Sequence, residues 1–258
     1  MTPTGIKGNA SEIALARGAA YGLLAHAFRY PDSEHWSRFT ERGRWGAWPE
    51  ILNHERPEVG DALRHLQERF RSADPARSVS IDQAQAAFSR LFGHTVKGAC
   101  PAYELEYGTG EVFQRSASLS DLQGFYAAFG LELQGRERSD HVSVECEFMS
   151  VIAAKEAYAS QEQESESLQT VREAAQRFLE AHLGRWIPSL ARRISEADPV
   201  GFYGALGNFA ASFIRSECRY YGVCAGPQLL ELRSADEGEE TTQRCAVGDL
   251  GTGCPMSA

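Results

Sequence analysis

The sequence lacks the features that mark membrane, secreted and nucleic-acid-binding proteins. No stretch of about 18 consecutive apolar residues occurs, so no transmembrane helix is expected. The start of the chain has no cationic segment followed by an apolar run, so no secretory leader is expected. No dense Lys/Arg cluster occurs, and the net charge is −9. We therefore expect a soluble cytoplasmic protein without membrane insertion or a nucleic-acid partner, and a basic peptide suits its charge better.

Signatures of catalysis and of metal binding are also missing. The sequence has no Walker-type loop, no G-x-S-x-G and no H-E-x-x-H, so nothing in it supports nucleotide hydrolysis, a serine hydrolase or a zinc protease. We expect a protein that is not an enzyme and that holds no stable prosthetic group. Six cysteines in 258 residues are too few for a disulfide scaffold, and reduced thiols are expected. An alternative, a metal-binding or redox protein, stays open with weak candidate ligands that form no C-x2-C pair: Cys218, Cys224, Cys245 and Cys254.

Sustained two-residue alternation is absent as well, so strands are not needed to explain the pattern. Apolar residues instead recur every three or four positions in segments separated by Gly and Pro, which predicts an all-α bundle of roughly ten helices. Ser11 is the expected cap of the first helix, and Ser80 with Gln83 has the form of a capping box. Pro188 is expected to limit a later helix, and Asp198 to cap the last one.

A charged stretch divides the predicted chain in two. Residues 131–141 are expected to form a hinge between an N-terminal helical subdomain, 1–130, and a C-terminal helical subdomain, 142–225. Residues 226–258, a Gly-rich acidic segment with cysteines, are expected to form a mobile tail. The helix that follows the hinge is apolar on most sides, which predicts a central position in the bundle.

The hinge carries two carboxylates beside an imidazole: Glu137, Asp140 and His141. The carboxylates can raise the pKa of the neighbouring histidine, and they can also form an ionic anchor for a cation. The alternative is that Asp140 caps the following helix while the other two side chains are solvated. On that helix, Glu145 and Glu147 are expected to point outward or to pair with arginine.

Residues 93–110 form a long predicted loop without a sustained period. Loops of this length are uncommon in compact domains unless they are functional or disordered. One interpretation is an aromatic and acidic rim for a peptide, with Tyr103 and Tyr107 supplying area and Glu104 and Glu106 meeting basic groups. The other is a packed surface loop. If one groove binds a peptide, this loop lies close to the hinge.

The string Glu137–His141, followed by Val144–Met149, resembles the signature of the TorD/DmsD family of cytoplasmic chaperones for molybdenum-containing oxidoreductases, which includes NarJ-like proteins. The segments Cys100–Glu104 and Phe178–Pro188 are similar to that family too. Ser139 stands where the family usually has Pro, so a stiff entry to the following helix is absent. The tail and the His-Leu-x-Arg-Trp run look like the branch that serves nitrate-, selenate- or hydrocarbon-oxidising complexes.

The resemblance implies an all-helical chaperone that binds the twin-arginine signal peptide, or the apo catalytic subunit, of its client until cofactor insertion and export. The hinge carboxylates would pair with guanidinium groups, the hinge histidine would orient a carboxylate or donate a hydrogen bond, and the loop tyrosines would cover the apolar part of the peptide. The implied site residues are Glu137, Asp140, His141, Tyr103, Glu104 and Tyr107.

Some properties stay open at this point. Contact with the molybdenum cofactor or with a guanine nucleotide is not decided by any motif. A hinged helical fold also allows copies to exchange domains, and so to form a homodimer. A third class of function, a structural adaptor that binds partners through an apolar helix face, remains beside the chaperone and the metal or redox protein.

Overall fold

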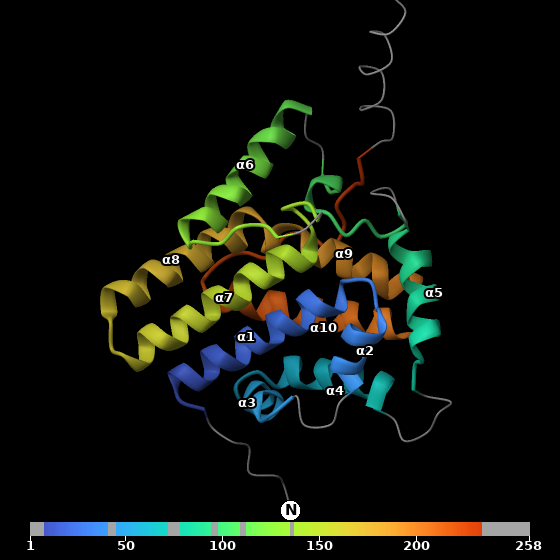
Figure 1. The fold of residues 1–258 in the computed structure, drawn as a ribbon, viewed down its shortest axis with the longest axis horizontal. Helices are drawn as coiled ribbons and strands as arrows, with labels where there is room; N and C mark the ends of the chain where they lie inside the picture. Colours follow the sequence, from blue (N-terminus) through green and yellow to red (C-terminus); the bar gives the residue numbers. More distant parts are fainter. Residues whose placement is uncertain are drawn as a thin grey trace, which may run out of the picture.

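A computed structural model describes residues 8–40, 45–71, 78–93, 98–108, 112–134 and 137–233. These residues are helical over most of their length and carry two isolated β-bridges but no strand, so the all-α expectation is confirmed (Figure 1). The helices are α1 (Ala10–Ala27), α2 (Ser33–Thr40), α3 (Trp48–Glu55), α4 (Pro57–Arg71), α5 (Ile81–Phe92), α6 (Val112–Ala128), α7 (Val142–Gln161), α8 (Ser165–Ala181), α9 (Leu183–Ala197) and α10 (Phe202–Tyr220), with a 3₁₀ turn at Glu104–Glu106.

The centre of the fold is the pair α1 and α7, which lie side by side (Figure 1). Small residues allow the close approach: a Cβ on Gly18 would lie 3.4 Å from the Cβ of Ala153. The hydroxyl of Ser150 donates a hydrogen bond to the Gly18 carbonyl at 2.9 Å. The central position predicted for the helix after the hinge is therefore confirmed.

One apolar core draws on residues from both sides of the predicted hinge. Tyr21 of α1, for example, packs edge-on against Phe213 of α10, with ring centroids 4.7 Å apart. Phe148 of α7 lies at the centre of a second aromatic group, 4.6 Å from Phe178 and 5.1 Å from Tyr126 between centroids. The division into subdomains stays a prediction, because these contacts do not report whether the two halves move.

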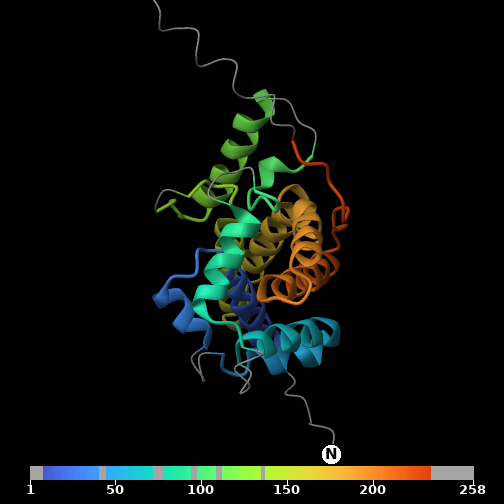
Figure 2. The same ribbon diagram turned by 90° about the vertical axis from the view of Figure 1, so that its right-hand side faces the viewer.

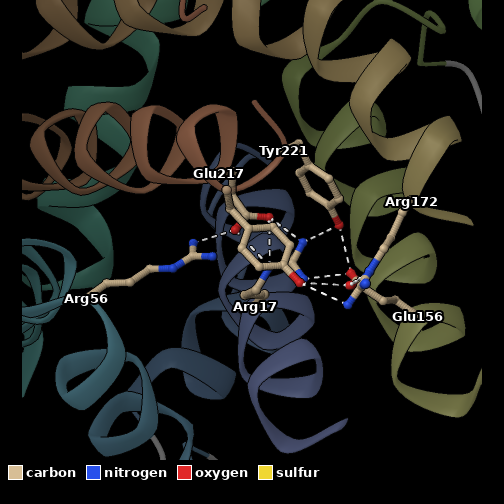
Figure 3. A network of polar contacts seen from close by, with 7 residues as sticks. Arg17, Arg56, Glu156, Arg172, Glu217 and Tyr221 are labelled. Carbon is tan, nitrogen blue, oxygen red and sulfur yellow. Dashed lines mark hydrogen bonds and ion pairs between the residues drawn. The ribbon is translucent and has the colours of Figure 1, made fainter. Parts of the chain in front are cut away.

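A buried ion network joins helices that are distant in the sequence (Figure 3). Arg17 Nε of α1 lies 2.8 Å from Glu217 Oε1 of α10, and Arg17 Nη1 lies 2.7 Å from Glu156 Oε2 of α7. Arg56 adds a second guanidinium to Glu217, and Arg172 of α8 lies 2.8 Å from Glu156. Burial alone would raise the pKa of Glu217, but Arg17 and Arg56 hold it below its ordinary value. The network therefore joins α1, α7, α8 and α10, and its pairs of Arg17 with Glu156 and Glu217 lie away from water.

Several helix ends differ from the expected ones. The capping box of Ser80 and Gln83 is confirmed, but α1 is capped by Asn9, whose side chain accepts from the Glu12 backbone, and the assignment to Ser11 was wrong. The expected cap of α10 is displaced too. Gly201 occupies the N-cap position, although the Asp198 carboxylate still accepts hydrogen bonds from the first turn of the helix.

Pro188 does not end a helix, as the pattern had indicated, but lies inside α9. The break falls earlier, at His182, between α8 and α9. A proline has no N–H for the carbonyl four residues before it, which here belongs to Gly184. The backbone N–H of Gly226 donates to that carbonyl at 2.9 Å. Gly226, which lies 38 residues after Pro188, thus supplies the hydrogen bond that the Gly184 carbonyl does not receive from Pro188.

Residues 223–233, which we call the C-terminal strap, run along α9 toward the loop before α6 (Figure 2). The strap passes so close to α9 that a Cβ on Gly226 would lie 1.9 Å from the Arg185 carbonyl oxygen. Its far end pairs with the loop, where Gly108 donates to the Glu231 carbonyl at 2.8 Å. The first part of the predicted tail therefore lies against the bundle, and the rest, from residue 234, falls outside the described residues.

Candidate functional site

The predicted loop and hinge lie next to each other, as expected for a shared site. An antiparallel bridge joins Tyr103 to His141. The Glu104 N–H donates to the Asp140 carbonyl at 2.9 Å, and the Val142 N–H donates to the Ala102 carbonyl at 2.9 Å. The proximity of the two segments is confirmed, and the backbone of the loop is fixed directly to the start of α7.

Asp140 is fully buried and does not cap α7, so that alternative was wrong. Its carboxylate accepts from Arg138 Nε at 2.9 Å and from Arg138 Nη2 at 2.7 Å, which is a two-pronged ion pair. A third hydrogen bond comes from the Leu105 backbone N–H at 3.2 Å. Burial raises the pKa of Asp140, and Arg138 opposes that shift. The carboxylate is therefore already paired with an arginine of this chain.

His141 is the N-cap of α7. Its Nδ1 accepts from the Ser143 backbone at 3.2 Å and lies 2.7 Å from the Ser143 hydroxyl. The ring packs edge-on against Tyr103 with centroids 4.9 Å apart. Burial lowers the pKa of His141 to about 4, so the imidazole is neutral at physiological pH. A neutral histidine that accepts at Nδ1 is a structural cap, and the hydrogen bonds described for it go to Ser143 rather than to Asp140.

Tyr103 and Glu137 meet at the surface, outside the buried Asp140 and His141. The Tyr103 hydroxyl donates to Glu137 Oε1 at 2.8 Å, while Glu137 itself is exposed. Burial, and then the hydrogen bond to Glu137, raises the pKa of Tyr103 well above its usual value, so the phenol stays protonated. Of the predicted site residues, these two line an open cavity.

The cavity has a volume of about 810 Å³, and we call it the α7 groove. It lies between α7, the segment that follows α6 and the end of α1. Val144, Phe148 and Val151 share one face of α7, and the partly exposed Val144 and Val151 supply apolar surface in front of the buried Phe148. Three carboxylates and one guanidinium stand around them, and Arg29 lies 2.6 Å from Glu147. The lining residues are Arg29, Tyr103, Tyr126, Leu131, Glu132, Leu133, Gln134, Glu137, Ser143, Val144, Glu147, Phe148 and Val151.

Glu104 is buried and bound from within rather than at a rim. Its carboxylate lies 2.5 Å from Arg185 Nη2 and 3.0 Å from His182 Nδ1. The other nitrogen of His182 lies 3.1 Å from an Asp121 carboxylate oxygen on α6. Glu104 therefore joins the loop to the junction of α8 and α9 and, through His182, to α6.

Tyr107 is also buried. Its hydroxyl donates to the Pro101 carbonyl at 2.8 Å, and its ring lies 5.2 Å from the Trp186 ring between centroids. Glu106 lies 3.0 Å from Arg115 of α6 and 3.7 Å from Arg138. Together with Glu104, these residues form the layer beneath the surface of the predicted site.

Of the two glutamates on α7, Glu147 is exposed and paired with Arg29, as expected, but the expectation for Glu145 was wrong. Glu145 is fully buried, and its Oε2 accepts from Trp186 Nε1 at 3.2 Å. Its Oε1 has no hydrogen-bond partner among the described residues. Burial, together with the nearby charges of Glu104 and Asp140, raises the pKa of Glu145 well above its ordinary value. Burial therefore favours the protonated, neutral form of the Glu145 carboxyl.

The sequence had not singled out most of the groove: Arg29, Glu132 and Leu133 carried no motif. A signal was present on α7, where Val144, Phe148 and Val151 follow the i, i+4, i+7 spacing of one helix face. That spacing predicts an apolar stripe, but it does not tell whether another helix covers the stripe. Only the fold shows that this stripe faces a cavity.

The cysteines give no support to a metal centre in the part of the chain that is described. Cys100, Cys146 and Cys218 are buried free thiols, and Cys224 is an exposed one. Cys245 and Cys254 lie outside the described residues. Among the residues that are described, no group of three or more His, Cys, Asp or Glu side chains could hold a metal ion. Within the same residues, no helix is both long and apolar enough to cross a membrane.

Comparison with known proteins gives a consistent result. Residues 53–192 match the family model of the nitrate reductase delta subunit. A perchlorate reductase assembly chaperone of Dechloromonas aromatica is 32% identical over 206 residues, 78% of this chain and 87% of that protein. A selenate reductase assembly chaperone of Thauera selenatis is 29% identical over 224 residues, 85% of this chain and 95% of that protein.

The chaperone protein TorD of Vibrio cholerae is 25% identical over 168 residues, 64% of this chain and 71% of that protein. No solved structure gives a significant match. The relatives are named as chaperones, which agrees with the expectation that this chain is not an enzyme. The resemblance noted in the sequence is confirmed, and the chain belongs to the nitrate reductase delta subunit family, together with TorD-like and reductase assembly chaperones.

Proposed function

We propose that this protein is an assembly chaperone for a molybdenum-containing oxidoreductase. It binds the apo catalytic subunit and its twin-arginine signal peptide in the cytoplasm, and it holds them until the cofactor has been inserted and export begins. Support for a reductase client comes from relatives named as perchlorate and selenate reductase assembly chaperones. The signal peptide as ligand is proposed from the charge and shape of the α7 groove.

The observation that carries the proposal is the combination of an apolar wall and an acidic rim in one groove. Val144 and Val151 offer apolar surface to the hydrophobic part of a peptide, and the buried Phe148 lies behind them. Glu137 and Glu132 stand at the same groove, and carboxylates form two-pronged ion pairs with guanidinium groups. A peptide that joins arginines to an apolar segment fits both features at once.

The predicted site residues take two positions in this proposal. Glu137 and Tyr103 contact the peptide directly, because both line the groove. His141, Glu104 and Tyr107 act beneath it, where they fix the loop, the start of α7 and the junction of α8 and α9 in place. No prosthetic group is needed for binding, and contact with the molybdenum cofactor or a guanine nucleotide is not required.

Affinity capture from the native cell, followed by mass spectrometry, tests the proposal. We expect the wild-type chain to recover the catalytic subunit of a molybdenum-containing oxidoreductase, with its signal peptide still attached. A Glu132→Gln/Glu137→Gln variant should recover less of it, because two rim charges are removed. A matched control, Glu173→Gln/Glu180→Gln, changes two exposed carboxylates on α8 and should recover the wild-type amount. Recovery of unrelated proteins alone would contradict the proposal.

A homodimer formed by domain exchange stays a separate prediction. Light scattering of the purified chain tests it, since a dimer has twice the mass of 28.4 kDa expected for one copy. A metal analysis of the same sample tests the competing class of function, because a zinc or iron centre formed by the C-terminal cysteines would copurify with the protein.

A further inference from the structure

Arg138 lies in a complete set of contacts for a guanidinium group. Asp140 meets it with both carboxylate oxygens, at 2.9 and 2.7 Å. The Tyr103 ring lies beneath the guanidinium, with 4.8 Å from its central carbon to the ring centroid. Glu106 adds a second carboxylate at 3.7 Å. A forked carboxylate pair together with an aromatic face is the arrangement that recognises arginine rather than lysine.

The two partners of this ion pair differ in how firmly the fold holds them. The Asp140 side chain is 0% exposed, and the Leu105 N–H fixes it from the protein side. The Arg138 side chain is 35% exposed and approaches from the solvent side. The acceptor is therefore part of the fold, whereas the cation occupies a place that solvent can reach.

This place adjoins the α7 groove. Tyr103 belongs to both sites: its ring packs under Arg138, and its hydroxyl donates a hydrogen bond to Glu137 at the groove. Glu106 has another cation as well, because Arg115 lies 3.0 Å away. Removal of Arg138 would thus leave Glu106 with Arg115 but would leave Asp140 without a cation. Asp140 lies next to the proposed path of the peptide.

We propose that Asp140, Tyr103 and Glu106 form a guanidinium-binding site that Arg138 occupies in the free protein, and that an arginine of the bound peptide displaces Arg138. The identity of the incoming arginine rests on the proposed function, but the site itself rests on these contacts alone. Because one guanidinium replaces another, Arg138 competes with the ligand. The apparent affinity for the peptide is then the intrinsic affinity multiplied by the fraction of molecules in which Arg138 has left the site.

The first experiment uses a small probe, L-arginine amide, in calorimetry and thermal unfolding of the full chain. Arg138→Ala should bind the probe and gain thermal stability at concentrations where the wild type shows neither effect. The response should disappear in Arg138→Ala/Asp140→Asn and should be much smaller with L-lysine amide, which lacks the forked donor. Arg192→Ala, which frees the exposed partner Glu196, is the matched control and should not respond.

If Arg138→Ala does not fold, Arg138→Met keeps an apolar stem over Tyr103 and replaces it in the test. Absence of any probe binding by a folded Arg138 variant would overturn the proposal.

A second measurement separates this proposal from the proposed function. The signal peptide of the captured client should bind Arg138→Ala about tenfold more tightly than wild type, because the competing arginine is gone. If wild type binds the peptide and the variant binds it equally or more weakly, the displacement proposal is wrong while the chaperone function stands. If the variant binds arginine amide but neither protein binds the peptide, the guanidinium site stands and signal-peptide binding falls.

Discussion

Arg17 and Glu217, 200 residues apart in the sequence, form a two-pronged ion pair in which both side chains are almost completely buried. The pair lies where α1, α7 and α10 meet (Figure 3). Neither charge could be left there alone, because an unpaired ion in the interior loses its hydration without compensation. The pair therefore makes the packing of α1 depend on the last helix of the chain.

Replacement of Arg17 by methionine should lower the free energy of unfolding by about 3–5 kcal/mol, because it removes one partner of a buried network. Urea unfolding followed by circular dichroism measures this change. Arg192→Met is the control, since it breaks an exposed pair with Glu196 and should cost about 0–1 kcal/mol. Equal losses in the two variants would show that the buried network does not stabilise the fold as described.

Gly226 is expected to tolerate no side chain. A Cβ there would lie 1.9 Å from the Arg185 carbonyl oxygen, so Gly226→Ala should displace the C-terminal strap and cost about 1–3 kcal/mol of stability. Gly124, inside α6, has no described atom beyond its chain neighbours and its own helix backbone within 4 Å of its Cβ position, so Gly124→Ala should stabilise by about 0.5–1 kcal/mol. Thermal unfolding of both variants should therefore move in opposite directions, and a harmless Gly226→Ala would disprove the close contact.

Glu145→Gln should reduce the loss of stability that the wild type shows as the pH rises. Burial raises the folded-state pKa of Glu145 above the ordinary 4.5, so the folded state keeps a proton that the unfolded state loses. The wild type therefore loses stability as pH rises above about 4.5, and a neutral glutamine removes that loss. In urea unfolding, the stability difference between variant and wild type should grow as the pH rises above the ordinary pKa of 4.5. A difference that stays constant would mean that Glu145 is ionised in the fold.

His141 should show the opposite dependence. Its folded-state pKa, lowered by burial to about 4, lies below the ordinary value of 6.5, so the unfolded state takes up a proton first. Its contribution to stability is present above pH 6.5 and is lost as pH falls toward 4. His141→Asn can still cap α7 and should lack this loss, whereas His141→Ala should cost about 1 kcal/mol at pH 7. Identical profiles for wild type and His141→Asn between pH 7 and pH 5 would count against a neutral, buried imidazole.

Local chemistry explains why part of the fold was predictable. The capping box of Ser80 and Gln83 involves neighbours in the sequence, and the apolar period of α7 follows from its own residues. Pro188 was misjudged because the donor that compensates for it, Gly226, belongs to a distant segment. A single sequence gives no sign of such a partner.

The site was predictable to a similar extent. Hinge and loop were correctly expected to meet, but which carboxylates face solvent was not foreseeable. Glu104 is bound by His182 and Arg185 from about 80 residues away, and those partners turn it inward. Among the described contacts, the hydrogen-bond partners of Glu137 are the Tyr103 hydroxyl and the Arg138 backbone N–H. Glu137 therefore remains at the groove.

We propose that the α7 groove binds an arginine-bearing apolar peptide. Titration calorimetry of the client's signal peptide against wild type, Glu132→Gln/Glu137→Gln and the control Glu173→Gln/Glu180→Gln tests it most directly, with circular dichroism to verify the fold. The groove variant should lose about tenfold or more in affinity, and binding by the wild type should weaken as salt is added. Equal affinity of all three proteins would contradict it.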